Sequence, residues 1–150
     1  MIIYGSIAAY FASLSFAFLF NLNKKTAFLT AIGGSIGWIC FTLGQDVFRD
    51  PSIAYFSGAV GLTFYAEIMA RMMKTPVTSY VTPALIPLVP GGGLYRTMLQ
   101  SLAGDYNGAV QEGISTLMGS GALAIGILVV FTLMKAYYSI RRKLEIYEKN

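Results

Sequence analysis

The sequence predicts an all-α, polytopic membrane protein of about five transmembrane helices, the fourth broken by a proline- and glycine-rich segment. Hydrophobic residues make up 55% of the 150-residue chain and charged residues only 12%, about half the charge of a typical soluble domain. The mean hydropathy is +0.61. Uncharged runs recur at about the 20-residue length that crosses a bilayer. We therefore expect residues 1–150 to form one integral membrane domain.

The first three predicted spans are continuous. Residues 2–22 carry no charge, and the first basic residues, Lys24 and Lys25, lie after this run rather than before it. We therefore interpret the run as a retained span and not as a cleaved signal peptide. Residues 26–45 form a second uncharged run, and residues 53–70 form a third with a single acidic residue.

Two further runs complete the predicted bundle. Residues 76–103 are long enough to cross, but four prolines and a glycine triplet interrupt them. Because proline removes a backbone donor and glycine permits positive φ, a continuous helix through residues 87–93 is not expected. At membrane depth such backbone is tolerated only inside protein or against a water-filled cavity. Residues 113–134 form the last span.

The distribution of positive charge predicts the orientation of a multi-pass protein. An odd number of spans places the two ends on opposite sides of the membrane. With the N-terminus outside and the C-terminus in the cytoplasm, nine Lys and Arg residues face inward, Arg49 alone faces outward, and Arg96 lies within a span. The inverted arrangement reverses this count, against the tendency of positive residues to stay inside.

Composition excludes several classes of function. The chain has no histidine and one cysteine, Cys40, which excludes imidazole catalysis, His-based metal sites, cysteine clusters and an internal disulfide. Paired carboxylates suited to hydrolysis are absent, and no dinucleotide fingerprint has the required strand–turn–helix context. The basic residues form no stripe typical of nucleic-acid binding. We expect no enzyme activity, catalytic residue, cofactor, metal or nucleic-acid partner.

The interrupted fourth run carries the clearest functional signal. Two short helices meeting there would leave the amides near Gly92, Gly93 and Leu94 unpaired at the positive end of the second helix, which attracts anions. Arg96 follows within about one turn and can make a two-pronged contact with a carboxylate. Pro87 and Pro90 would form the structural break. The predicted substrate-binding residues are Gly91, Gly92, Gly93, Tyr95, Arg96 and Thr97.

The alternative is a kinked structural helix, with Arg96 reaching an interface or a lipid phosphate. Glu67 also has two interpretations. It is the one acidic residue well inside a run and is a candidate for proton coupling, since a membrane carboxylate must be paired or neutralised. Arg71, four residues later, can instead form a structural ion pair with it. We interpret Glu112 as a solvated boundary residue.

Small residues also recur at intervals of four, as in the pairs Gly33/Gly37 and Ala54/Gly58. This spacing aligns them on one helical face and allows helices to approach closely. Internal packing is the simpler account of most of these pairs.

The segment Ile86–Arg96, with the sequence IPLVPGGGLYR, resembles the I-P-x-x-P-G signature of the threonine/serine exporter family. More specifically, the chain resembles the small, membrane-only subunit of the two-component type. The GGSIGW sequence of residues 33–38 and residues 76–81 support the resemblance, which extends over nearly the whole chain.

The resemblance implies a secondary exporter of the inner (cytoplasmic) membrane, driven by an ion gradient, with the proton as the expected coupling ion. Family members are associated with threonine and serine, and some two-subunit relatives with dicarboxylates such as succinate. It also implies a partner, namely a larger subunit with a cytoplasmic domain. The alternative arrangement is a homo-oligomer. In both arrangements the protein contacts membrane lipid. A five-span unit can join an oppositely oriented one around a central site. The alternative function is a non-transporting membrane scaffold.

Overall fold

The computed structural model describes the backbone of residues 2–147 and the side chains of residues 2–141. Every regular element in this range is helical, which confirms the all-α prediction. The elements are α1 (Ile2–Leu19), α2 (Lys24–Phe48), α3 (Pro51–Met73), α4 (Thr78–Leu85), the short 3-10 helix η1 (Ile86–Leu88), α5 (Gly91–Leu102) and α6 (Tyr106–Tyr147).

Four of the described helices, α1, α2, α3 and α6, are long and apolar enough to cross a membrane. The predicted fourth crossing is divided instead between α4, η1 and α5. These contain 8, 3 and 12 residues. At a rise of about 1.5 Å per residue, none of them spans the roughly 30 Å hydrocarbon core alone. A fifth crossing made by the three elements together stays a prediction.

Polar caps explain the sharp turn between α2 and α3. Helix α2 ends at Phe48, and the C-cap residue Arg49 adopts a left-handed conformation with φ of 55°. The side chain of Asp50 then accepts hydrogen bonds from the amides of Ser52 and Ile53, and Pro51 occupies the first turn of α3. An acidic N-cap followed by proline favours helix initiation.

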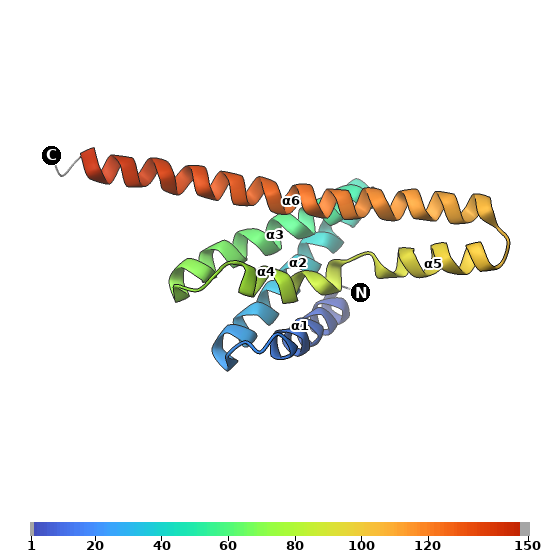
Figure 1. Cartoon of the computed structure of the whole chain (residues 1–150), viewed down its shortest axis with the longest axis horizontal. Helices are drawn as coiled ribbons and strands as arrows, with labels where there is room; N and C mark the ends of the chain where they lie inside the picture. The colour runs from blue at the N-terminus through green and yellow to red at the C-terminus, as the bar shows by residue number, and fades with distance from the viewer. Residues whose placement is uncertain (1, 148–150) are drawn as a thin grey trace.

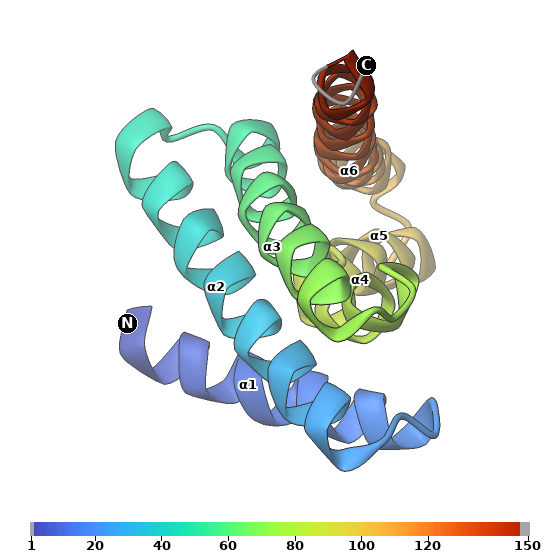
Figure 2. The ribbon, with the colours of Figure 1, turned by 90° about the vertical axis from the view of Figure 1, so that its left-hand side faces the viewer.

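Helices α1, α2 and α3 pack in sequence, and α4 contacts all three. Figure 2 shows the first three side by side, with α6 seen end-on beside α3. Among the described helices, α5 packs only against α6. In Figure 1, α5 and the first part of α6 form a hairpin that extends beyond the α1–α4 bundle. Gly104, with φ of 81°, allows the tight turn of this hairpin.

Leu88 joins η1 to the bundle. It lies between α2 and α3, where Gly37 of α2 and Gly58 of α3 have no side chains and leave space for it. A Cβ on Gly58 would lie 2.7 Å from Leu88 Cδ2 and 3.1 Å from the carbonyl oxygen of Gly37. Leu88 is only 2% exposed. The small residues therefore form a notch that holds the segment before α5, in agreement with the packing interpretation of their spacing.

The basic residues of three helices gather at one end of the bundle. Hydrogen bonds from Tyr65 to Leu29 and from Thr30 to Ser79 tie the start of α2 to α3 and α4. The Arg71 guanidinium lies 3.4 Å from the centre of the Tyr138 ring. These contacts place the end of α3 beside the start of α2 on one side and beside the later part of α6 on the other. The side chains of residues 142 and 143, and residue 149, lie outside the described residues.

We expect Gly58→Ala to lower the stability of the folded protein. The added methyl must displace Leu88 or separate α2 from α3, and overpacking of this kind costs about 1–3 kcal/mol. Thermal unfolding of the purified protein in detergent measures the effect. Gly121→Ala is the matched control, because a Cβ at Gly121 meets nothing within 4 Å and the change removes a glycine from a helix, a gain of about 0.5–1 kcal/mol. Equal midpoints for the two variants would contradict the notch.

Candidate functional site

Helical geometry stops after Leu88 and resumes at Gly91. Val89 is extended, with ψ of 132°, and Pro90 has φ of −74° and ψ of 56°. Neither Pro87 nor Pro90 has an amide hydrogen to continue a helical ladder. The chain therefore changes direction between η1 and α5.

The amides at the start of α5 are largely satisfied from within the segment. The amide of Gly91 donates to the Val89 carbonyl at 2.7 Å, and those of Gly93 and Leu94 both donate to the Pro90 carbonyl, at 3.2 and 3.3 Å. The expectation that Gly93 and Leu94 have unpaired amides is therefore wrong. The conformation of Pro90 turns its carbonyl into the first turn of α5, where it accepts both hydrogen bonds.

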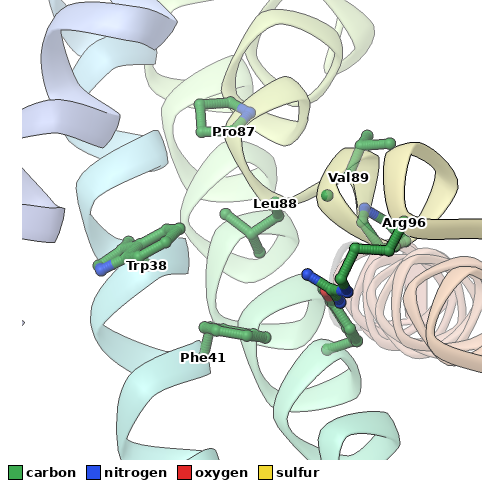
Figure 3. A pocket seen from close by; sticks show the side chains of 10 residues that line it. Trp38, Phe41, Pro87, Leu88, Val89 and Arg96 are labelled. Atoms are coloured by element: carbon green, nitrogen blue, oxygen red, sulfur yellow. The ribbon is translucent and has the colours of Figure 1, made fainter. Parts of the chain in front are cut away.

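Two adjoining cavities lie beside this break, with volumes of about 190 and 210 Å³. Both are lined by Phe41 of α2, Tyr55 of α3, Pro90, Gly93 and Arg96. The first extends toward Trp38, and the second toward the C-terminal end of α2 and the first turns of α6. Figure 3 shows Trp38, Phe41, Leu88 and Arg96 around the first cavity.

Aromatic side chains form the wall of the cavities on the α2 and α3 side. The ring centres of Trp38 and Phe41 are 5.6 Å apart, and those of Phe41 and Tyr55 are 4.9 Å apart. These separations are typical of favourable aromatic pairs. The site therefore combines an apolar wall with a cationic side chain.

That cation has an anionic partner. The Nε atom of Arg96 lies 3.2 Å from Oε2 of Glu112, and the two side chains are 58% and 31% exposed. The Nη1 atom of Arg96 lies 3.5 Å from the position that a Cβ on Gly92 would take, so the guanidinium folds back over the first turn of α5. Glu112 also lines the second cavity. The interpretation of Glu112 as a solvated boundary residue is therefore wrong, because the α5–α6 hairpin brings it to Arg96.

Five of the residues predicted for the break and its binding site line a cavity: Pro87, Pro90, Gly92, Gly93 and Arg96. Three do not. A Cβ on Gly91 would meet nothing within 4 Å, and Tyr95 is 66% exposed. The hydroxyl of Thr97 donates to the Gly93 carbonyl at 2.9 Å.

Sequence reasoning missed Phe41, Gln45, Tyr55 and Thr116 as lining residues. They come from three different helices, and only Phe41 and Gln45, four residues apart on α2, share a helical spacing.

Glu67 lies away from the two cavities, about three turns along α3 from Tyr55. Its Oε2 atom accepts a hydrogen bond from Arg71 at 3.1 Å, and the residue is 6% exposed. The pair joins residues four apart on one helix, as in the structural interpretation. Among the described residues, no group of three or more His, Cys, Asp or Glu side chains could hold a metal ion.

The family model described as Threonine/Serine exporter, ThrE, matches residues 5–133, from α1 through the break and both cavities to the apolar part of α6. The chain belongs to the threonine/serine exporter family. No curated protein and no solved structure matches it. Family membership and the four helices able to span a bilayer indicate a membrane protein. Family membership also indicates an exporter-type transport role, and it favours a protein that is not an enzyme.

The contact between α5 and α6 can be tested by a disulfide. A Cβ on Gly93 would lie 3.2 Å from Thr116 Cβ, close to the 3.5–4.5 Å or so of a disulfide. We expect Gly93→Cys with Thr116→Cys to cross-link on mild oxidation, in a background where the lone Cys40 is replaced by serine. Loss of both free thiols, measured by mass after maleimide treatment, reports the bond. Gly91→Cys with Thr116→Cys is the control and stays reduced; equal cross-linking of the two pairs would contradict the register of the hairpin.

Proposed function

We propose that the chain is a membrane subunit of a secondary exporter for small carboxylate-bearing metabolites, either amino acids of the threonine/serine type or dicarboxylates such as succinate. Arg96 would bind the substrate carboxylate. The observation that carries this proposal is the position of Arg96, which lines both cavities beside the first turn of α5.

The chemistry of the site suits such a ligand. A guanidinium offers parallel donors that match the geometry of a carboxylate, and the N-terminal end of α5 adds a favourable dipole. Gly92 and Gly93 keep the approach free of side chains. Pockets for drug-sized ligands have about 300–1,000 Å³, so the smaller cavities here favour a metabolite of a few heavy atoms. In this proposal Pro87 and Pro90 hold the break, and Gly91, Tyr95 and Thr97 support α5 rather than touch the substrate.

For the coupling ion we propose the proton. Glu67 is the carboxylate that the sequence singles out for this task. Its hydrogen-bonded partner Arg71 supports a structural role instead, since the ion pair satisfies the buried carboxylate without a proton.

We also propose that the chain works with a second membrane unit, either a larger exporter-like subunit with a cytoplasmic domain or a second copy. The exposed face of α5 supports this, because Leu94, Tyr95, Met98 and Leu102 are all more than half exposed and α5 packs on α6 alone within the described chain. Inverted pairing of two units around a central site is common in secondary transporters. The gathered basic end supports an inner-membrane orientation with the N-terminus outside and the C-terminus in the cytoplasm.

The carboxylate site is tested by counterflow of labelled threonine, serine and succinate in vesicles that contain the chain with whatever copurifies from native membranes. We expect Arg96→Gln to abolish flux while insertion and assembly persist, because no other guanidinium lines the described cavities. Arg49→Gln removes an arginine at the α2–α3 turn and is the control, with flux near that of the wild type. Unchanged flux in Arg96→Gln would remove the proposal. A wild-type assembly without flux for any of the three substrates would favour the scaffold function.

Substrate binding can be followed without transport. Trp38 is the one tryptophan of the chain and lines the first cavity, so its fluorescence reports on the site directly. We expect the bound carboxylate to change Trp38 emission in a saturable way and Gly92→Asp to abolish the change, because the added carboxylate competes for Arg96. A saturable response that survives in Gly92→Asp would place the ligand elsewhere.

A further inference from the structure

The site holds an anion opposite its cation, and this arrangement bears on which carboxylates it accepts. Glu112 lines the second cavity together with Arg96, Gln45, Ser115 and Thr116. The Arg96–Glu112 contact joins α5 to α6 across the hairpin and stays accessible, since neither side chain is fully buried.

This ion pair differs from the other one in the described chain. Arg71 and Glu67 are four residues apart on one helix and hydrogen bonded, and the guanidinium also stacks on Tyr138. The Arg96–Glu112 pair is held by a single contact, in which one nitrogen of Arg96 lies 3.2 Å from one oxygen of Glu112. Most donors of the Arg96 guanidinium therefore remain available to a ligand.

An α-amino acid carries a carboxylate and an ammonium group on the same carbon atom. If it enters between the two side chains, its carboxylate pairs with Arg96 and its ammonium with Glu112. Both protein charges then keep a partner of opposite sign when their own contact opens, so neither Arg96 nor Glu112 is left facing the cavity without a counter-charge. A dicarboxylate would direct its second negative charge at Glu112, and a 2-hydroxy acid would leave Glu112 without a cation.

The other groups around Glu112 do not supply an alternative partner. Among the described lining residues of the second cavity, Tyr55 of α3 is the other titratable group besides Arg96, while Gln45 of α2 is neutral. The hydroxyl of Thr116 donates to the backbone carbonyl of Glu112, at 2.7 Å, and thus not to its carboxylate. The carboxylate therefore faces the cavity with Arg96 as its counter-ion.

We infer that Glu112 is the ammonium-binding residue of a zwitterion site and that it selects α-amino acids over dicarboxylates and 2-hydroxy acids. This inference rests on the proposed carboxylate site at Arg96. The proposed function allows both amino acids and dicarboxylates as substrates. According to the inference, Glu112 is the residue that discriminates between them.

The test compares substrates that differ in one charge. Counterflow is measured for threonine, for 2,3-dihydroxybutanoate, which has the same skeleton with a hydroxyl in place of the ammonium, and for succinate. The wild type is expected to prefer threonine. Glu112→Gln should lower threonine flux about tenfold to a hundredfold, as for a lost hydrogen bond to a charged group, and bring the threonine-to-hydroxy-acid ratio close to one. Glu112→Asp keeps the charge and should keep the preference.

Asp46→Asn is the control, since it removes an exposed carboxylate that lines neither of the two cavities and should leave the ratio unchanged. A wild-type ratio in Glu112→Gln, at wild-type flux, overturns the inference. If Glu112→Gln fails to insert, the wild-type protein still decides: an equal Trp38 response to threonine and to 2,3-dihydroxybutanoate overturns the inference.

The outcomes for Arg96 separate the two claims. Flux that depends on Arg96 but favours succinate overturns the role of Glu112 and leaves the carboxylate site standing. Two outcomes overturn the proposed function and the inference with it. One is flux of all three substrates that does not depend on Arg96. The other is the absence of both flux and a Trp38 response with every one of them.

Discussion

The structure depends on how a broken backbone is held against apolar helices. Away from water each peptide group needs a partner, and two prolines separated by two residues cannot continue a helical ladder. The chain meets this constraint locally, because the Pro90 carbonyl accepts the amides of Gly93 and Leu94. It also anchors the break sterically, because Leu88 occupies the notch that Gly37 and Gly58 form between α2 and α3. The break is thus a fixed element of the bundle rather than a loose connection.

The site follows from that anchoring. With Leu88 held between α2 and α3, the chain leaves the bundle at Pro90, and α5 packs on α6 alone among the described helices. The absence of a side chain at Gly93 lets α5 approach Thr116 closely, and this contact sets the rotation of α5 so that Arg96 meets Glu112. The aromatic side chains of α2 and α3 close the other side. A cation, an anion and an apolar wall are therefore brought together by glycine contacts that carry no chemistry themselves.

Much of the fold could be predicted from the sequence, because apolar runs and polar caps are local signals. The starts of α2 and α3 follow from Asn23, Asp50 and Pro51, which act on neighbouring residues. The site was predictable only in part. Arg96 and Gly93 stand beside the proline break, but Glu112 lies sixteen residues away across a turn, and no helical spacing connects the two. Tyr95 and Thr97 do not share the position of Arg96, because successive residues of a helix turn by about 100°. Tyr95 is exposed and Thr97 packs toward Gly113 of α6, and the Gly93–Thr116 contact that sets this rotation is tertiary.

The two ion pairs show why charge inventory alone does not assign function. Glu67 and Glu112 are both glutamates within or beside apolar runs, and each has an arginine within 3.2 Å. Glu67 is buried, hydrogen bonded to a partner on its own helix, and that partner is stacked on an aromatic ring, so separating the pair would break several contacts at once. Arg96 and Glu112 belong to different helices and share one contact that opens to a cavity. A ligand that carries both charges can replace that contact without leaving either residue unpaired. A structural ion pair therefore differs from one that a substrate can replace in its geometry, not in its residue types.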